Sequence, residues 1–187
     1  QNPDKRLANA STTKIMTALL TLEPPDQDRY FTVDSDAIQV EGTTMGLQPG
    51  DSVTLHQLAA GMLLPSGNDA ANAAAVEIAG GEEAFVRLMN QRAAELGLEN
   101  TQYRNPSGLD AEGHYSSAYD MALLARACLE NEARAEIAAT KSATVDGRVL
   151  TNHNKLLWQY EGCIGLKTGY TEKAGRTLVS AARRGGM

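Results

Sequence analysis

The heptapeptide ASTTKIM (residues 10–16) places a serine three residues before a lysine, at the head of an apolar run. The apolar positions that follow fit one buried face of a helix over residues 11–23, which a Pro-Pro pair ends. Ser11 then has two interpretations. It is a favoured N-cap residue, so it can simply begin the helix. Residues three apart also share a helix face, so the Lys14 amine can reach the Ser11 hydroxyl and act as its base.

Two further short motifs favour the second interpretation. Ser66 and Asn68 form a Ser-x-Asn in a loop between two predicted helices, and Lys-Thr-Gly occupies residues 167–169 on a predicted strand. By average composition, Ser-x-x-Lys or Ser-x-Asn arises about once in a chain of this length, but Lys-Thr-Gly in only a few of about a hundred. Taken alone, Ser-Gly-Asn is also typical of a turn, and Lys167 of a solvated strand-edge charge. All three in this order resemble the set of penicillin-binding proteins and class A β-lactamases, which have S-D-N where this chain has Ser-Gly-Asn.

Longer stretches make the resemblance specific. Five segments are similar to the D-alanyl-D-alanine carboxypeptidases, the low-molecular-mass penicillin-binding proteins: ASTTKIMTALL, LLPSGNDAAN, NPSGLD, NKLLW and GLKTGYTEKAGRTLVSAA. The likeness covers essentially the whole chain. It implies an α/β (α+β) fold of the β-lactamase/transpeptidase type, an antiparallel sheet flanked by helices with an inserted, mostly helical lobe over residues 24–142.

The same resemblance predicts the domain organisation. We expect residues 1–187 to form a single penicillin-binding/transpeptidase-like catalytic domain that is truncated at both ends. Family members carry strands before the serine helix and further strand and helix after the last strand of this chain, so the central sheet is expected to be incomplete. Ser66 and Asn68 should lie on one wall of a cleft and Lys167 on the other.

Local patterns predict the remaining elements. A capping box at Thr54 and Gln57 begins one helix, and Ser117 caps another. An Asp-Gly pair at residues 146–147 predicts a hairpin, and the segments after residue 163 read as two further strands. Helices are expected over residues 54–64, 69–79, 82–96, 118–130 and 134–139, with a helical turn at NKLLW.

Composition narrows the class of protein. With 42% hydrophobic and 21% charged residues, the chain is typical of a soluble globular protein. The net charge of −6 and the lack of a basic cluster argue against a nucleic-acid partner. No signal peptide or transmembrane run is present, but both ends look cut, so this says nothing about compartment.

Cysteine and histidine usage predicts neither a metal nor a cofactor. Cys128 and Cys163 lack metal-ligand spacing and are interpreted as free thiols, with a disulfide between them as the alternative. The three histidines, at positions 56, 114 and 153, are scattered and show no zinc pattern.

The residue types suggest a role for each motif. A serine hydroxyl needs a base, and Lys14 can serve only as a neutral amine although an exposed lysine has a pKa of about 10.4. Burial, repulsion from Lys167 and the positive end of the serine helix all lower that pKa. Lys167 and Thr168 suit the terminal carboxylate of a peptide substrate. Ser66 suits proton relay to the leaving amine, and Asn68 suits the substrate amide.

The oxyanion needs two N–H donors. In the family these are main-chain groups, which by position belong to Ser11 and Tyr170. Gly169 fits this assignment, because a strand edge without a side chain lets the substrate approach the backbone. The predicted site comprises catalytic Ser11, Lys14 and Ser66, and substrate-binding Asn68, Lys167, Thr168, Gly169 and Tyr170.

Four neighbouring residues receive structural interpretations. Asp69 is expected to be the first-turn acid of its helix, and Asn72 a buried polar support. His153 can approach the site because it precedes the Lys-Thr-Gly strand, but a solvated turn is the preferred interpretation. Cys163 is interpreted as a packing residue rather than a nucleophile.

The resemblance implies a serine-type carboxypeptidase that removes the terminal D-alanine of peptidoglycan stem peptides through a Ser11 acyl-enzyme. Its partners would be the stem peptide and, as covalent inhibitors, penicillin and other β-lactam antibiotics. Because the wall lies outside the cytoplasmic membrane, we expect an extracytoplasmic protein, periplasmic or at the cell surface. The family also implies a C-terminal membrane anchor, so that membrane association would come only from segments beyond these residues.

Two alternatives remain open. A serine β-lactamase would share the acylation groups but needs a water-activating glutamate, usually in Glu-x-x-Leu-Asn. That pattern is absent, and the nearest segment, EAFVRLMN at residues 83–90, has the wrong spacing and lies in a predicted amphipathic helix. A catalytically inactive peptidoglycan-binding module is disfavoured because the three motifs are intact.

Overall fold

The computed structural model describes residues 2–185. Eight helical segments and six strands occur in that range. The helices are η1 (Ala10–Thr13, a 3₁₀-helix), α1 (Lys14–Thr21), α2 (Leu55–Leu63), α3 (Asn68–Ala79), α4 (Glu82–Glu95), α5 (Ala118–Leu129), α6 (Glu132–Ala139) and α7 (Leu156–Gln159). The strands are β1 (Phe31–Thr32), β2 (Ser52–Val53), β3 (Ser142–Val145), β4 (Arg148–Thr151), β5 (Cys163–Thr171) and β6 (Gly175–Ala182).

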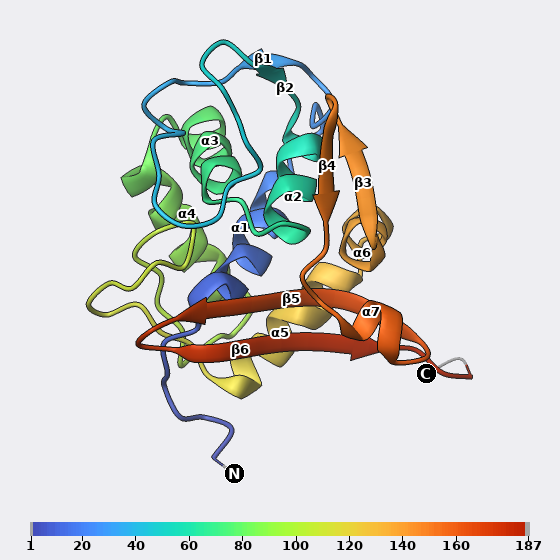
Figure 1. Ribbon diagram of the computed structural model, residues 1–187. Coiled ribbons are helices and arrows are strands. Elements are labelled where there is room, and N and C mark those ends of the chain that lie inside the picture. Colours follow the sequence, from blue (N-terminus) through green and yellow to red (C-terminus); the bar gives the residue numbers. More distant parts are fainter. Residues whose placement is uncertain (1, 186–187) are drawn as a thin grey trace.

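The strands pair as three separate antiparallel hairpins: β1–β2, β3–β4 and β5–β6. The long β5–β6 hairpin crosses one end of the molecule, with η1 and α5 behind it and α7 in front (Figure 1). Helices α1 to α4 gather at the other end, and α1 lies at their centre. The predicted helix-flanked antiparallel architecture is confirmed, with the long hairpin as its largest sheet.

Local sequence signals set several boundaries as predicted. The Thr54 hydroxyl accepts from Gln57 N at 3.1 Å while the Gln57 side chain accepts from Thr54 N at 2.9 Å, which completes the capping box of α2. Ser117 caps α5, and Asp146 and Gly147 both take positive φ in the β3–β4 turn. The remaining predicted helices begin or end within two residues of the observed bounds.

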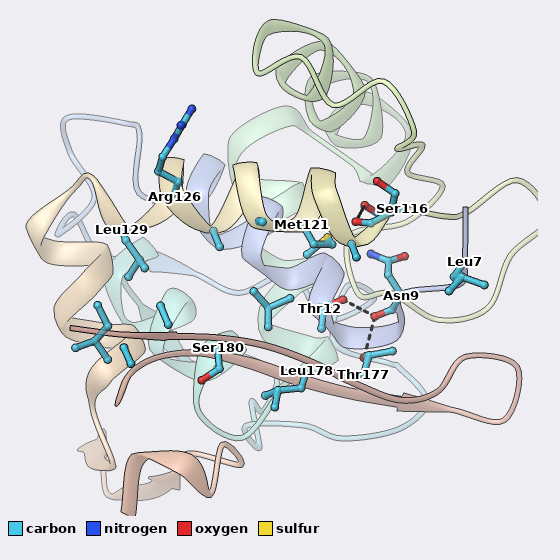
Figure 2. A pocket seen from close by; sticks show the side chains of 18 of the residues that line it. Leu7, Asn9, Thr12, Ser116, Met121, Arg126, Leu129, Thr177, Leu178 and Ser180 are labelled. Carbon is cyan, nitrogen blue, oxygen red and sulfur yellow. Dashed lines mark hydrogen bonds between the residues drawn. The ribbon is translucent and has the colours of Figure 1, made fainter. Parts of the chain in front are cut away.

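The segment before the serine turn is tied to the long hairpin. The Asn9 carbonyl accepts from Thr12 Oγ1 at 2.5 Å and from Thr177 Oγ1 of β6 at 3.2 Å (Figure 2). An apolar cavity of about 820 Å³ lies beside this junction, between Met121 of α5 and Leu178 of β6. The two contacts at Asn9 therefore place the serine turn against the sheet.

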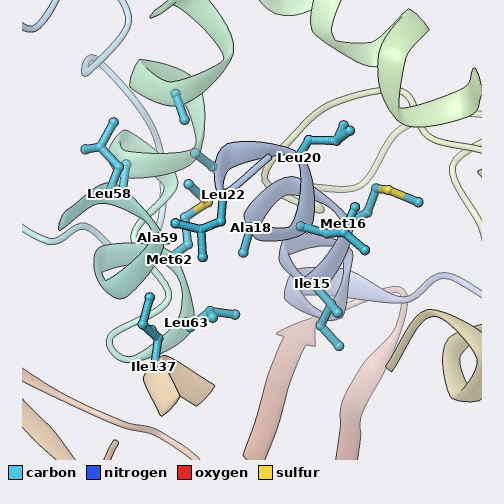
Figure 3. Close-up of a cluster of buried hydrophobic side chains, with 14 of the residues drawn as sticks. Ile15, Met16, Ala18, Leu20, Leu22, Leu58, Ala59, Met62, Leu63 and Ile137 are labelled. Atoms are coloured by element: carbon cyan, nitrogen blue, oxygen red, sulfur yellow. The ribbon is translucent and has the colours of Figure 1, made fainter. Parts of the chain in front are cut away.

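Helix α1 is the centre of the core. All eight of its residues are buried, so the prediction of a single buried face is too narrow. Met62 and Leu63 of α2 and Ile137 of α6 lie on one side of it (Figure 3), and α3, α4, α5 and β5 also contact it. A helix covered on every side must satisfy its polar groups internally. The Thr17 hydroxyl donates to the Pro106 carbonyl at 2.6 Å and so joins α1 to the loop before α5.

Of the two interpretations of Ser11, the N-cap is not the one found, because Asn9 holds the N-cap position. A Ser11 cap would require the helix to begin at residue 12, whereas η1 begins two residues earlier at Ala10 and contains Ser11. Ala10, just before the serine, has φ 47°, a region that costs an L-residue about 1–2 kcal/mol. The positive φ at Ala10 therefore places Ser11 within the 3₁₀ turn rather than before its first residue.

Gly108 makes the closest backbone approach to this turn. A Cβ built on it would lie 2.0 Å from the Ala10 carbonyl oxygen and 3.0 Å from Ser11 N. The residue also has φ +87°, which favours glycine. Only glycine at this position lets the loop that carries it pack directly on the serine turn.

Replacing Gly108 with alanine should destabilise the fold more than the same change at Gly50. Both glycines have φ +87°, but nothing lies within 4 Å of a Cβ built on Gly50. The left-handed strain is therefore shared, and overpacking against Ala10 adds about 1–3 kcal/mol for Gly108→Ala alone. Urea unfolding of the two variants measures the difference, and equal losses of unfolding free energy would contradict the packing account.

Candidate active site

The three sequence motifs meet at one cavity of about 610 Å³. Ser11 lines it from η1, and Ser66 and Asn68 line it from the loop and first turn of α3. The β5 segment of residues 168–171 forms a further part of the wall. The two motif lysines lie behind this lining, with Lys14 0% and Lys167 1% exposed.

Lys14 is held by three oxygen atoms. Its Nζ lies 2.9 Å from Ser11 Oγ, 2.6 Å from Asn68 Oδ1 and 2.6 Å from the Ser107 carbonyl oxygen. The last two are pure acceptors, so they take two N–H groups of the amine. A neutral amine then has its lone pair left for the third contact, in which it can accept the hydroxyl proton of Ser11.

The surroundings of Lys14 favour that neutral form. Burial is the largest cause that lowers its pKa well below the ordinary lysine value, and the positive charge of Lys167 lowers it further. The carboxylate of Asp69 acts in the opposite direction. Lys14 forms no direct ion pair within residues 2–185, so Asp69 offsets the effect of burial only from a distance.

Asn68 has a positioning contact on each side of its amide. Oδ1 accepts from Lys14 Nζ, and Nδ2 donates to the Glu41 carbonyl at 2.6 Å. A Cβ built on Gly42 would lie 2.9 Å from Asn68 Nδ2, so the loop before β2 packs tightly on the amide. These contacts add a hydrogen bond to Lys14 to the sequence interpretation of Asn68, whose assignment to the substrate amide stays a prediction.

Asp69, at the start of α3, fixes the loop of residues 45–47 next to Ser66. The buried Asp69 carboxylate accepts from the backbone N–H groups of residues 45–47 at 2.9 to 3.0 Å, and from Ala70 N at 2.8 Å. It is therefore more than the predicted first-turn acid, because it fixes a separate loop to the start of α3. Ser66 itself has φ 68° and its carbonyl accepts from Thr43 Oγ1 at 2.8 Å.

The glycine between Ser66 and Asn68 has a steric reason. A Cβ built on Gly67 would lie 2.7 Å from Asp69 Oδ1, 2.9 Å from Met45 N and 3.0 Å from the Gly61 carbonyl oxygen. An aspartate at this position, as in S-D-N, would collide with the loop that Asp69 anchors. The departure from S-D-N thus follows from local packing.

Strand β5 brings the Lys-Thr-Gly motif against the serine turn. A Cβ built on Gly169 would lie 2.7 Å from Ser11 N and 2.5 Å from Thr177 Oγ1. Residues two apart on a strand share a face, so Lys167 points to the same inner side as Gly169. The interpretation of Lys167 as a solvated edge charge is therefore wrong.

The amine of Lys167 has few hydrogen-bond partners. Its Nζ donates to the Thr168 carbonyl at 2.7 Å, which is the single hydrogen bond of this amine among the described residues. Burial lowers the pKa of Lys167 to about 7. An anion that entered the cavity and reached Nζ would raise this pKa and hold the charged form.

Of the neighbouring residues, His153 lines the cavity and is exposed, and its backbone N donates to the Leu64 carbonyl at 3.2 Å. Burial, and then the charge of Lys167, lowers the pKa of His153. Cys128 is buried in α5 and Cys163 begins β5, both as free thiols. Asn72 is half-buried. Within residues 2–185, no group of three or more His, Cys, Asp or Glu side chains is placed to hold a metal ion.

Sequence reasoning missed the backbone partners of the site. The Ser107 and Glu41 carbonyl groups, which accept from Lys14 and Asn68, carry no residue-type signal. It also missed His114, whose Nδ1 accepts from Arg104 N at 3.1 Å while Nε2 lies 2.8 Å from Thr13 Oγ1. This arrangement leaves the proton on Nε2, and burial lowers the pKa of His114 to about 4. A neutral imidazole thus supports the turn beside Ser11.

Comparison with known proteins gives one consistent family. Residues 1–187 match the Peptidase S11 family model, described as D-alanyl-D-alanine carboxypeptidase. The chain is 42% identical over 197 residues to the D-alanyl-D-alanine carboxypeptidase DacF of Bacillus subtilis, which aligns with 100% of this chain. It is 42% identical over 183 residues to DacB2 of Mycobacterium tuberculosis, which aligns with 95%. The chain spans 51% and 62% of the lengths of these two relatives.

Solved structures agree with the sequence comparison. The D-alanyl-D-alanine carboxypeptidase of Mycobacterium tuberculosis superposes with a TM-score of 0.93 at 40% identity, over 100% of this chain and 72% of that chain. The Streptomyces K15 DD-transpeptidase superposes with a TM-score of 0.92 at 33% identity, over 98% of this chain and 79% of that chain. The predicted penicillin-binding, DD-peptidase type of fold is confirmed.

The burial of Lys167 should appear in the pH dependence of stability. Its folded pKa of about 7 lies below the ordinary value of 10.5, so the unfolded chain binds more protons between these two pH values. Stability should therefore rise with pH in this window, by at most about 1.4 kcal/mol per pH unit for one group. Lys167→Met should flatten the slope of unfolding free energy between pH 7 and 9.

The matched control is Lys155→Met, because Lys155 lines the same cavity but is exposed. It should keep the slope of the unaltered protein in denaturant titrations at the two pH values. An equal slope in Lys167→Met and the unaltered protein would show that Lys167 is protonated in the folded state throughout this range.

Proposed function

The chain belongs to the Peptidase S11 family of D-alanyl-D-alanine carboxypeptidases, and from this membership we propose a serine-type D-Ala-D-Ala carboxypeptidase acting on peptidoglycan stem peptides. The observation that carries the proposal is the contact of 2.9 Å between Lys14 Nζ and Ser11 Oγ beside an open cavity. The other two contacts of Nζ are to acceptors, which leaves its lone pair for the hydroxyl proton.

Acylation begins at Ser11. Its Oγ attacks the carbonyl carbon of the penultimate D-alanine while the hydroxyl proton moves to Lys14 Nζ. The carbonyl oxygen becomes an oxyanion, and the N–H groups of Ser11 and Tyr170 are proposed to stabilise it. The proximity of Gly169 to Ser11 N supports this pair, because it brings the β5 backbone next to the serine amide.

Collapse of the tetrahedral intermediate breaks the peptide C–N bond. The leaving nitrogen takes a proton, which Ser66 is proposed to relay, and D-alanine departs as the free amino acid. A water molecule then attacks the ester on Ser11, which releases the shortened stem peptide and returns the proton to the hydroxyl. Ser66 suits the relay because it lines the same cavity as Ser11.

Recognition of the leaving residue is assigned to Lys167, Thr168 and Asn68. The terminal carboxylate of the substrate is proposed to interact with Thr168, which lines the cavity, and with Lys167, which is buried behind that lining. Binding of this anion raises the pKa of Lys167 from about 7 and so keeps its positive charge in the complex. Asn68 is proposed to bind the substrate amide with the second N–H of Nδ2 and the second lone pair of Oδ1. The first of each is used by the Glu41 carbonyl and by Lys14.

Slow hydrolysis of the acyl-enzyme formed with a β-lactam would distinguish this protein from a β-lactamase. The residues that line the cavity in the described part of the chain include no Asp or Glu that can activate a deacylating water. The segment nearest to the β-lactamase pattern lies in α4, where Asn90 Nδ2 donates to the Tyr103 carbonyl at 3.0 Å. Penicillin should therefore form a lasting acyl-enzyme.

The remaining assignments depend on the same function. Residues 1–187 are proposed to form one catalytic unit whose helical lobe covers about residues 24–142. Partners are the stem peptide and β-lactams, and the substrate places the protein outside the cytoplasmic membrane, at the periplasm or cell surface. Among the described residues, no helix has the length and apolar character needed to cross a bilayer. A membrane anchor is accordingly proposed only for segments beyond these residues.

Mass spectrometry after penicillin treatment tests the function. The full-length protein should gain one penicillin mass, located on the tryptic peptide that contains Ser11, and Ser11→Ala should gain none. Labelling that disappears within minutes would support a β-lactamase. An adduct on another residue, or none at all, would overturn the acyl-enzyme assignment.

Exchanging each motif lysine for arginine separates their roles. Arginine does not deprotonate near neutral pH, so Lys14→Arg should reduce the rate of Ser11 acylation by about 10²–10⁴-fold. Lys167→Arg keeps a cation and should retain part of the activity, limited by the larger guanidinium. Stopped-flow acylation by a β-lactam measures both rates. If Lys14→Arg acylates as fast as the unaltered protein, Lys14 is not the base.

A further inference from the structure

The proposed site has a direction along β5. Lys167 and Thr168, assigned to the terminal carboxylate, come first in the strand. Gly169 follows beside the serine, since a Cβ built on it would lie 2.7 Å from Ser11 N. The part of a substrate on the acyl side of the scissile bond must then extend toward the next residues, Tyr170 and Thr171, at about 3.3 Å per residue.

Arg176 lies at this acyl-side end. It is the register partner of Tyr170 in the β5–β6 hairpin, so both side chains project from the same face. Arg176 is exposed and lines the cavity that Ser11 also lines. None of the ion pairs found within residues 2–185 includes Arg176.

The other cationic groups of the cavity lie toward the opposite end. Lys155 follows Asn154, whose Nδ2 donates to Ser180 Oγ at 3.5 Å. Ser180 pairs with Leu166, one residue before Lys167. Lys155 is thus placed near the strand segment assigned to the terminal carboxylate, and Arg176 is the cation of the acyl side.

The charge of the lining is unusual for this protein. The chain has a net charge of −6, yet the cavity lining within residues 2–185 includes Lys155 and Arg176 and no acidic residue. Asp110 approaches from the neighbouring loop, where its carboxylate accepts from Thr171 Oγ1 at 2.9 Å, but it does not line the cavity. An anionic group entering at this end therefore meets an unpaired guanidinium.

We propose that Arg176 binds a carboxylate on the residue that precedes the D-Ala-D-Ala pair, and so selects stem peptides with an acidic side chain there. The inference rests on the proposed carboxypeptidase function. A guanidinium is suited to a carboxylate because it donates two parallel N–H groups. Tyr170 (66% exposed) and Leu178 (52% exposed) line the cavity beside it and can cover the aliphatic stem of such a side chain.

Three acetylated tripeptides test the selection: acetyl-L-Glu-D-Ala-D-Ala, the isosteric acetyl-L-Gln-D-Ala-D-Ala, and acetyl-L-Lys-D-Ala-D-Ala. Release of D-alanine from each gives kcat/KM for the full-length protein. The glutamate peptide should exceed the glutamine peptide by about two- to fivefold, as for an exposed ion pair, and the lysine peptide should be slowest. Raising the salt concentration should reduce the glutamate advantage.

Arg176→Gln should bring the glutamate-to-glutamine ratio to about one, and Arg176→Lys should keep part of it. The control Lys173→Gln removes a charge from the same hairpin at an exposed position that does not line the cavity, and should leave the ratio unchanged. If Arg176→Gln and the unaltered protein hydrolyse both peptides with the same glutamate-to-glutamine ratio of kcat/KM, the inference about Arg176 is overturned but the proposed function is not. Absence of D-alanine release from every peptide by the unaltered protein would overturn the proposed function, and the inference with it.

Discussion

The candidate site depends on one feature: the amine of Lys14 is buried and has no carboxylate partner at ion-pair distance within residues 2–185. Lys14 is fully buried, and its three contacts are a hydroxyl, an amide oxygen and a peptide carbonyl. An ammonium ion in this setting would lose its hydration without gaining a counter-charge, so the neutral amine is favoured. An aspartate at hydrogen-bonding distance would instead raise the pKa of the lysine and favour its charged form. The neutral amine is therefore favoured because the partners of Lys14 are dipoles rather than charges.

That constraint explains why distant segments must meet at η1 and α1. Asn68 and Ser107 each supply one acceptor, and the loops that carry them must approach the backbone closely. Gly108 lets its loop pack on Ala10 and Ser11, and Gly67 lets the loop before Asn68 pack on Met45 and Gly61, because a Cβ on either glycine would overlap these neighbours. Ala10, just before the nucleophile, takes positive φ where an L-residue is strained. Such conformations persist only where surrounding contacts fix them, as they do here around the amine.

Much of the fold could be predicted from the sequence because its signals are local. The capping box at Thr54, the Asp-Gly turn and the long hairpin depend on neighbouring residues, and all are found where the patterns place them. The N-cap interpretation of Ser11 does not hold because residues 10–13 form η1 under tertiary contacts that override the local preference of a serine. Lys167 was open to a surface interpretation, since strand alternation does not say which face the rest of the chain covers.

The sequence predicted which residues make up the candidate site better than it predicted the hydrogen bonds between them. The three motifs identify side chains by type and spacing, and the structure brings them to one cavity. The acceptors at Ser107 and Glu41 are main-chain carbonyl groups, which any residue could provide, so no sequence pattern reveals them. The sequence suggests a substrate contact for the amide of Asn68, and only the structure shows its two hydrogen bonds to Lys14 and to the Glu41 carbonyl.

The central claim, that Lys14 is a neutral amine in the resting protein, can be tested by NMR of the full-length protein carrying lysine labelled at Cε and Nζ. Lys14→Met would assign the resonance, and Lys155→Met would identify an exposed lysine for comparison. The account predicts that the Lys14 resonance changes from the ammonium to the neutral-amine position well below the ordinary pH range for lysine. A Lys14 resonance that stays in the ammonium position up to about pH 10, the ordinary range for lysine, would contradict the account.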